Sequence, residues 1–275
     1  MNAMKIQNRY REFLPESRRI VIKIGTSVIV QKTGRPDMRK MRNLVSQIAT
    51  LRRKGYEVLI VTSGAVGSGM ESLHIKERPK LVADLQMCAA VGQARLMAKY
   101  EELFAHEKLI IGQVLLTHDD FHHRIRMTNA RRTLEHLLRA GVVPIINEND
   151  VVADEELKAD LSLGDNDYLA ALVVKLVRAD LLIMLTTVDG LLAPDAAGRK
   201  RRLSCVETLG PDVFKLVNPS ANKLSKGGMD SKLRSAKIAV TAGCNVVMAN
   251  GCTQGVILDV MSGKDTGTLL LSTPI

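Results

Sequence analysis

Residues 19–64 read RIVIKIGTSVIVQKTGRPDMRKMRNLVSQIATLRRKGYEVLIVTSG, and this stretch decides the fold. Two short apolar runs rich in Val and Ile, 19–25 and 56–64, flank a longer segment with helical spacing over 38–55. A strand, a helix and a second strand in this order are typical of α/β proteins with a parallel sheet. We therefore expect the chain to begin its core with a β-α-β unit.

The same alternation continues towards the C-terminus. Further strands are expected at 109–117, 142–150, 180–190 and 245–251, and further helices at 128–141, near 166–179 and near 231–243. Several of these strands end in small or polar residues. Ligands gather at the carboxyl ends of strands in open parallel sheets, so we expect the functional site there.

Composition supports one large α/β domain. The chain has 275 residues, of which 46% are hydrophobic, and with 3% aromatic residues and no Trp the core is expected to consist of aliphatic residues and Met. No apolar run reaches the roughly 18 residues of a membrane span, and the N-terminus lacks the apolar core of a signal peptide. We therefore expect a cytoplasmic protein without membrane association, whose four cysteines are reduced thiols.

The formal net charge of +10 suggests an anionic ligand, although most basic residues occur in short separated groups that we interpret as solvated surface. A nucleic-acid partner is not expected, because basic residues interleaved with aromatics and known reader motifs are both missing. The six histidines are scattered, and we interpret them as surface residues rather than metal ligands.

Two glycine-containing turns follow the first two strands. In VIKIGTSV, Lys23 stands near the end of a strand and Gly25 follows it, so an ammonium and backbone N–H groups could meet phosphate oxygens. In VTSGAVGSGM, Ser63 and Gly64 begin a turn that could bind a phosphate or carboxylate at a helix N-terminus. Each has a structural alternative: Lys23 could extend to solvent from a strand edge, and the glycines could serve close packing.

Two clusters of amides and acids follow later. PIINENDVV contains Asp150, and LGDNDYLAA contains Asn166 and Asp167. Such groups can bind the ammonium and carboxylate of a small amino acid, or orient lysines that hold a phosphoryl group. Helix capping and turn formation are the structural alternative, and no EF-hand or His-containing metal pattern accompanies them. We predict no metal site built from protein ligands.

The fourth motif is SKGGMDSKLRSAKIA. A Gly-Gly turn precedes a helix that carries Lys232 near its start. Backbone N–H groups, a helix N-terminus and an ammonium would again converge on an anion.

Together these motifs, with LQMCAAVGQARLM, NARRTLEHLL, LTTVDGLL and GTLLL, resemble in order and spacing the glutamate 5-kinase branch of the amino acid kinase family. The resemblance covers nearly the whole chain from Arg19. It implies a three-layer α/β/α sandwich with a mainly parallel central sheet, and ATP-dependent phosphorylation of the side-chain carboxylate of L-glutamate. Mg²⁺ would arrive with ATP, proline would be a candidate feedback inhibitor, and we expect a homo-oligomer.

The resemblance also implies residue roles. Lys23 and Lys232 would bind the phosphoryl group, with Asp167 orienting both. Glutamate would contact the residues Ser63, Gly64, Asp150 and Asn166. ATP would contact both lysines and the residues Gly25, Thr186, Thr187, Lys226, Gly227, Gly228 and Met229.

We predict an N-terminal extension over 1–18 and a kinase domain over 19–275. Its first lobe, to about residue 176, would bind glutamate, and the second would bind ATP. The sequence departs from the family pattern at Thr187, where Asp is usual, at Lys226, and in ending without a PUA domain. A sister kinase with another acceptor and a non-catalytic amino-acid sensor remain the alternatives. Retention of Lys23 and Lys232 argues against the sensor.

Overall fold

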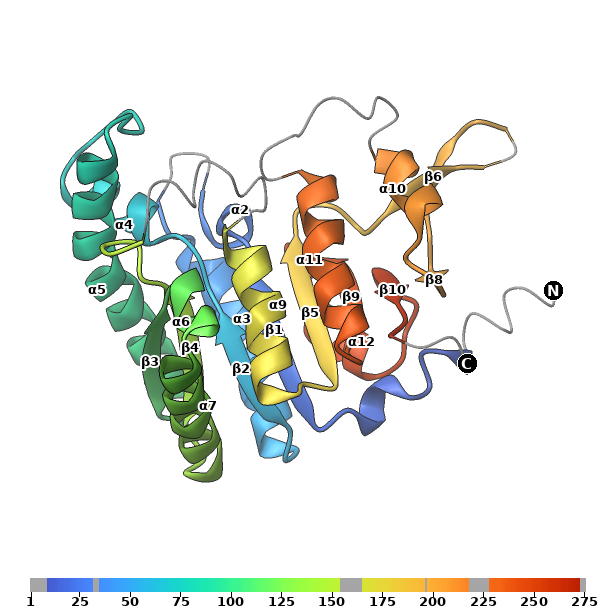
Figure 1. Cartoon of the computed structure of the whole chain (residues 1–275), viewed down its shortest axis with the longest axis horizontal. Helices are drawn as coiled ribbons and strands as arrows, with labels where there is room; N and C mark the ends of the chain where they lie inside the picture. Colours follow the sequence, from blue (N-terminus) through green and yellow to red (C-terminus); the bar gives the residue numbers. More distant parts are fainter. Residues whose placement is uncertain (1–8, 32–34, 154–164, 196, 218–227, 273–275) are drawn as a thin grey trace.

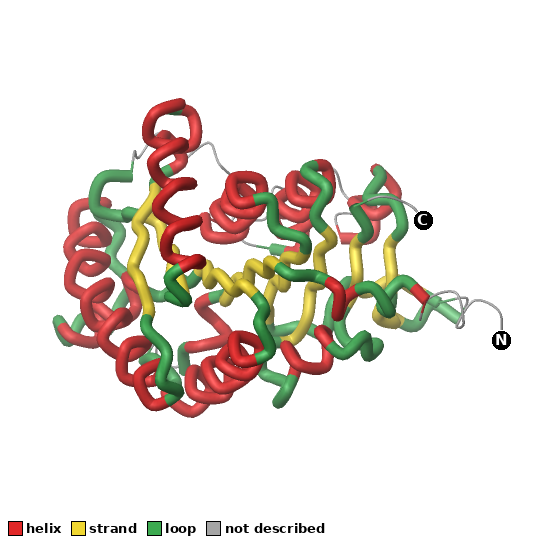
Figure 2. The backbone as a smooth tube through the Cα atoms, turned by 90° about the horizontal axis from the view of Figure 1, so that it is seen from below, coloured by secondary structure: helices red, strands yellow, loops and turns green. Residues whose placement is uncertain are grey.

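A computed structural model describes residues 9–31, 35–153, 165–195, 197–217 and 228–272. Its centre is an eight-stranded sheet in the order β3-β4-β2-β1-β5-β9-β10-β8. Figure 2 shows the sheet between helices on both sides. The predicted three-layer α/β/α sandwich is therefore confirmed.

All pairs in the sheet are parallel except β9 with β10, which agrees with the predicted mainly parallel sheet. A separate antiparallel pair, β6 with β7, forms a hairpin outside the sheet. The strands are β1 (Arg19–Ile24), β2 (Glu57–Val61), β3 (Ile111–Leu116), β4 (Val143–Glu148), β5 (Leu181–Thr186), β6 (Leu192–Pro194), β7 (Lys200–Arg202), β8 (Cys205–Val206), β9 (Asn245–Asn250) and β10 (Thr268–Leu270).

The helices divide between the two faces of the sheet (Figure 1). One face is covered by α3 (Met38–Arg53), α5 (Val82–His106) and α12 (Val256–Met261), and the other by α7 (Arg124–Arg139), α9 (Asp165–Val177) and α11 (Met229–Thr241). The shorter helices are α2 (Thr26–Ile29), α4 (Ala65–Ser72), α6 (His118–His122), α10 (Pro211–Val217) and the 3₁₀ helix η1 (Leu14–Glu16).

Side chains of β1 alternate between the two faces of the sheet, so this strand contributes to the core on each face. Ile20, Ile22 and Ile24 pack in the core that contains α3 and α5, whereas Val21 packs in the core that contains α9 and α11. Successive residues of a strand point to opposite faces, so Lys23 shares the face of Val21. The strand thus directs one lysine towards the α9 and α11 layer.

Residues before β1 pack onto the C-terminal part of the chain. The guanidinium of Arg11 is fully buried and donates hydrogen bonds to the carbonyls of Ser204, Thr266 and Gly267 at 2.7–2.9 Å. It also lies 3.2 Å from a carboxylate oxygen of Asp265. Burial lowers the pKa of Arg11, and the nearby carboxylate opposes that effect. The segment from residue 9 is therefore joined to the domain by a buried charged side chain.

One interpretation from the sequence is wrong: His118 is not a surface residue. It is buried at the start of α6 and lies edge-on to Tyr168 of α9, with 4.9 Å between the ring centroids. It follows the end of β3 by two residues, and its imidazole packs against Tyr168 as an aromatic side chain.

Glycines allow α4 and α5 to cross closely. A Cβ on Gly92 would lie 1.8 Å from the Ala65 carbonyl oxygen, and one on Gly69 would lie 1.8 Å from the Cys88 carbonyl oxygen. Both obstacles are backbone atoms, which cannot rotate away. The glycines of VTSGAVGSGM therefore include one, Gly69, that serves packing.

We predict that Gly92→Ala lowers the free energy of unfolding by at least about 1–3 kcal/mol, because the two helices must separate to admit the methyl group. Gly210→Ala is the matched control, since a Cβ there meets nothing within 4 Å. It should change stability by less than about 0.5 kcal/mol. Urea unfolding of both variants tests this, and equal stabilities would contradict the close crossing of α4 and α5.

Candidate active site

The carboxyl ends of β1, β2 and β5 lie together at one edge of the sheet. These strands are adjacent and parallel, and Lys23 is in register with Val61 of β2 and with Met184 of β5. Helices α9 and α11 begin at the same edge (Figure 1). In open α/β sheets, ligands bind at the carboxyl ends of the parallel strands, beside the N-termini of the helices that follow.

A carboxylate bridges two lysines at this edge. Lys23 Nζ lies 2.6 Å from Asp167 Oδ1, and Lys232 Nζ lies 2.7 Å from Asp167 Oδ2. The three side chains come from β1, the first turn of α9 and the first turn of α11. Each oxygen of one carboxylate therefore fixes a different ammonium.

Burial and charge act against each other in this triad. Asp167 is 2% exposed and Lys23 is 5% exposed. Burial lowers the pKa of Lys23, the Asp167 carboxylate opposes that shift, and the second ammonium on Lys232 adds to it. Burial alone would raise the pKa of Asp167, but the two ammonium groups hold it below the ordinary value. Two cations against one anion leave an excess positive charge, which suits an anionic ligand.

A polar pair lies next to the triad. The Asn166 side-chain amide donates a hydrogen bond of 2.8 Å to Ser63 Oγ. Asn166 precedes Asp167 on α9, and Ser63 follows β2, so the pair connects the helix to the loop after the strand. Gly64 comes next and has a φ of 103°, in the left-handed region that glycine adopts without strain.

The triad and the Ser63–Asn166 pair share one cavity of about 310 Å³. Gly25 lines it, and a Cβ there would lie 3.5 Å from Lys23 Nζ and 3.2 Å from the Leu185 carbonyl oxygen. A glycine thus keeps the space beside the ammonium open. Hydroxyl side chains also line it, namely those of Thr26, Ser27, Ser63, Thr186 and Thr187.

The sequence profile of the amino acid kinase family matches residues 18–250. The chain belongs to the amino acid kinase family. The glutamate 5-kinase of Caldanaerobacter subterraneus subsp. tengcongensis is 44% identical over 92% of this chain and 68% of its own length. That of Clostridium tetani is 39% identical over 96% of this chain and 98% of its own length. The resemblance seen in the motifs is thereby confirmed.

Solved structures show the same fold at low sequence identity. Carbamate kinase from Giardia lamblia bound to AMP-PNP aligns with a TM-score of 0.63 and 16% identity, over 94% of this chain and 99% of that one. N-acetylglutamate synthase from Neisseria gonorrhoeae aligns with a TM-score of 0.66 and 13% identity, over 99% of this chain and 65% of that one. At these identities the likeness establishes the amino acid kinase fold alone.

The structure gathers most of the site residues predicted for this amino acid kinase. The cavity lining includes the predicted residues Lys23, Gly25, Ser63, Asn166, Asp167, Thr186, Thr187 and Lys232. It does not include the predicted residues Gly64, Asp150, Gly228 and Met229. Lys226 and Gly227 lie outside the described residues.

The four predicted residues outside the lining lie close to it in the chain. Gly64 adjoins Ser63, and Gly228 is the N-cap of α11, with Met229 as the first helical residue. Asp150 is half-buried and comes two residues after the end of β4. Their roles in the amino acid kinase remain predictions.

Two structural features were not predicted, one in the cavity and one at the end of β4. Thr26 and Ser27 line the cavity from the first turn of α2, although only Gly25 was selected from that loop. The Asn147 amide donates a 2.8 Å hydrogen bond to Gln93 Oε1 of α5. Asn147 belongs to the PIINENDVV motif, but nothing in the sequence indicates that its partner is a glutamine 54 residues earlier.

Proposed function

We propose that the chain transfers the γ-phosphoryl group of ATP to the side-chain carboxylate of L-glutamate. The products are L-glutamate 5-phosphate and ADP, in the first step of proline biosynthesis. The observation that carries the proposal is the Asp167 carboxylate bridging Lys23 and Lys232 beside the Ser63–Asn166 pair. The glutamate 5-kinases that cover most of this chain support the choice of acceptor.

The chemistry needs alignment and charge neutralisation. A carboxylate oxygen of glutamate attacks the γ-phosphorus of ATP, the bond from that phosphorus to the β,γ-bridging oxygen breaks, and ADP leaves with the electron pair. The acceptor carboxylate is already a nucleophile, so no general base is required. Lys23 and Lys232 would stabilise negative charge on the transferring group and the bridging oxygen. Asp167 would keep both ammonium groups in position.

Glutamate would occupy the side of the cavity nearer β2. Ser63, Gly64 and Asn166 supply hydroxyl, backbone and amide groups for its carboxylates. Asp150, after β4, would pair with the α-ammonium. This assignment is supported by strand order, because β4 is adjacent to β2 and their carboxyl ends lie at the same edge.

ATP would occupy the side nearer β5 and α11. Gly25 and the Gly227–Gly228 turn would supply backbone N–H groups for its phosphates, supported by the N-terminus of α11. Thr186, Thr187, Lys226 and Met229 would contact the remainder of the nucleotide. We propose that Mg²⁺ enters on the ATP phosphates and holds its waters, which is its usual mode of binding in phosphoryl-transfer sites.

Further properties follow from the same proposal. Glutamate would bind in a first lobe that extends to about residue 176, and ATP in the second lobe. Proline is proposed as a feedback inhibitor, the active form as a homo-oligomer, and the compartment as the cytoplasm. No helix in the described ranges is long and apolar enough to span a bilayer.

Release of ADP with different acceptors tests the function. Glutamate should stimulate ATP turnover, whereas N-acetylglutamate, aspartate and carbamate should not. Stimulation by one of those three in place of glutamate would identify a sister kinase. Binding of glutamate without ADP release from folded protein would identify an amino-acid sensor.

We predict that Asp150→Asn weakens glutamate binding by about 2–5 kcal/mol, because the variant cannot pair its side chain with the α-ammonium. The measurement is isothermal titration calorimetry with glutamate. Asp212→Asn is the control, since Asp212 is an exposed carboxylate on α10. If Asp150→Asn bound glutamate with unchanged affinity, Asp150 would not pair with the α-ammonium.

A further inference from the structure

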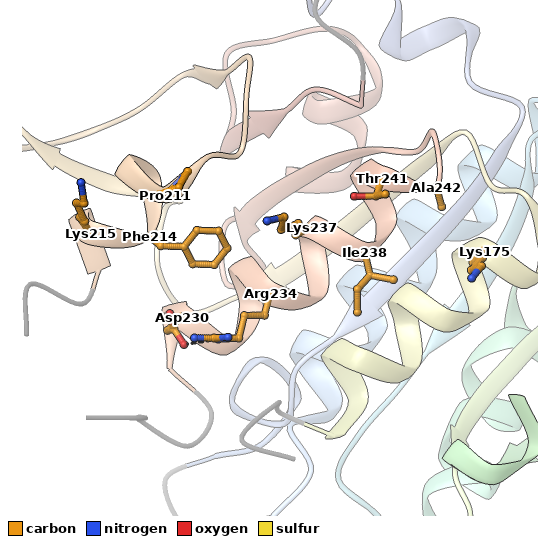
Figure 3. Close-up of a pocket in the computed structure, with 10 residues that line it drawn as sticks. All are labelled: Lys175, Pro211, Phe214, Lys215, Asp230, Arg234, Lys237, Ile238, Thr241 and Ala242. Atoms are coloured by element: carbon orange, nitrogen blue, oxygen red, sulfur yellow. Dashed lines mark hydrogen bonds and ion pairs between the residues drawn. The ribbon is translucent and has the colours of Figure 1, made fainter. Parts of the chain in front are cut away.

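A second, larger cavity lies on the outer side of α11. We define the α10–α11 groove as the cavity of about 870 Å³ between these helices and the end of α9. Figure 3 shows Phe214 reaching from α10 towards Lys237 of α11, with Ile238 and Thr241 further along α11 and Lys175 on α9. Within the part of the chain that the structure describes, it shares no lining residue with the cavity around Asp167.

The groove faces away from the lysine that belongs to the phosphoryl site. Arg234, Lys237, Ile238 and Thr241 recur at spacings of three, four and seven residues, which places them on one face of α11. Lys232 instead bonds Asp167 of α9 at the start of the helix. One helix thus borders two separate cavities.

The lining of the groove combines positive charge with apolar surface. Among the described residues, four cationic side chains line it, Lys175, Lys215, Arg234 and Lys237, against the one carboxylate of Asp230. That carboxylate accepts a 2.8 Å hydrogen bond from Arg234. Charge complementarity therefore favours an anion.

An aromatic ring gives the groove a place for a flat apolar group. Lys237 Nζ lies 5.9 Å from the centroid of the Phe214 ring, within range of a cation–π contact. Ile238 and Ala242 extend the apolar surface along the groove. An apolar lining with a few charged groups and a volume of several hundred Å³ is typical of small-molecule sites.

We propose that the α10–α11 groove is a second binding site, which takes a small organic anion with an aromatic body. The ring would lie against Phe214 and Ile238, and the acidic group would contact Lys237 and Lys175. The cationic side chains come from three helices, α9, α10 and α11.

Fluorescence titration with 8-anilinonaphthalene-1-sulfonate tests the proposal, because this probe joins an aromatic body to a sulfonate. We expect Lys237→Glu and Phe214→Leu each to weaken binding at least tenfold. Lys76→Glu is the matched control, since it makes the same charge change on an exposed lysine outside the groove. It should change the affinity less than twofold.

The titration is repeated with saturating ATP and glutamate, which distinguishes the groove from the site of the proposed kinase function. We expect them to leave the probe bound, since none of the described residues lines both cavities. Displacement by ATP would overturn the proposal and make the groove part of the nucleotide site. Equal probe affinity in wild type and both groove variants would overturn it as well. Kinase activity is measured separately, so either proposal can fail alone.

Discussion

Lys23→Met and Lys232→Met should each lower kcat by about 100-fold or more, equivalent to about 2.7 kcal/mol of transition-state stabilisation. In phosphoryl transfer the negative charge spreads over the transferring group and the bridging oxygen. Two ammonium groups held by one carboxylate would stabilise that distribution more than they stabilise bound ATP. Turnover should therefore suffer more than substrate affinity.

Steady-state kinetics on folded variants, checked by circular dichroism, measures this effect. Lys76→Met is the control for loss of one positive charge at an exposed position, and it should keep wild-type kcat. Arginine at position 23 or 232 should restore little activity, because its planar fork places the charge differently from a compact ammonium. A methionine variant with normal kcat and weaker ATP binding would show that its lysine only anchors ATP.

Asp167→Asn should destabilise the fold by about 3–5 kcal/mol and abolish most activity. Removing one partner of a buried ion pair leaves uncompensated charge, and here both Lys23 and Lys232 lose their carboxylate. Urea unfolding at neutral pH measures the loss. Asp212→Asn, which removes an exposed carboxylate that pairs with Lys215, should cost less than about 1 kcal/mol.

A double variant distinguishes charge repulsion from simple loss of packing. Lys23→Met combined with Asp167→Asn should be more stable than Asp167→Asn alone, because it removes one of the two unpaired ammonium groups. If the double variant were less stable by the sum of both single effects, repulsion between the lysines would not explain the loss.

The pH dependence of stability follows from the lowered pKa of Asp167. A carboxyl whose pKa is lower in the folded state stabilises the fold above its unfolded pKa, about 4. This contribution is lost as the pH falls through the lower folded value. The stability difference between wild type and Asp167→Asn should therefore be complete at neutral pH and shrink only in acid.

Local patterns were enough to predict the central layers of this fold. The apolar run that contains Lys23 predicts a buried strand, and the helix over 38–55 agrees with α3, which ends at Arg53. Helix α5 was missed, because its buried face includes the small residues Cys88, Ala89 and Gly92, which give a weak hydrophobic pattern. Its close contact with α4 depends on Gly69 and Gly92, whose role appears only when the two helices meet.

Residue patterns identify Lys23, Asp167 and Lys232 only as separate candidates, and it is the family resemblance that implies that Asp167 orients both lysines. Asp167 lies 144 residues from Lys23 and 65 from Lys232, so only the order of strands brings them together. The burial of Arg11, by contrast, had no signal in the sequence at all. Its main partners are backbone carbonyls. Every residue type has a backbone carbonyl, so the sequence could not indicate which residues would surround Arg11.

Trapping the product tests most directly whether a phosphoryl group reaches the side-chain carboxylate of glutamate. The product of that transfer is an acyl phosphate, which hydroxylamine converts to a hydroxamate detectable as its ferric complex. With ATP and glutamate, γ-glutamyl hydroxamate should form in proportion to the ADP released. Lys23→Met should lose both products together. Release of ADP by the wild-type protein without hydroxamate would contradict the account.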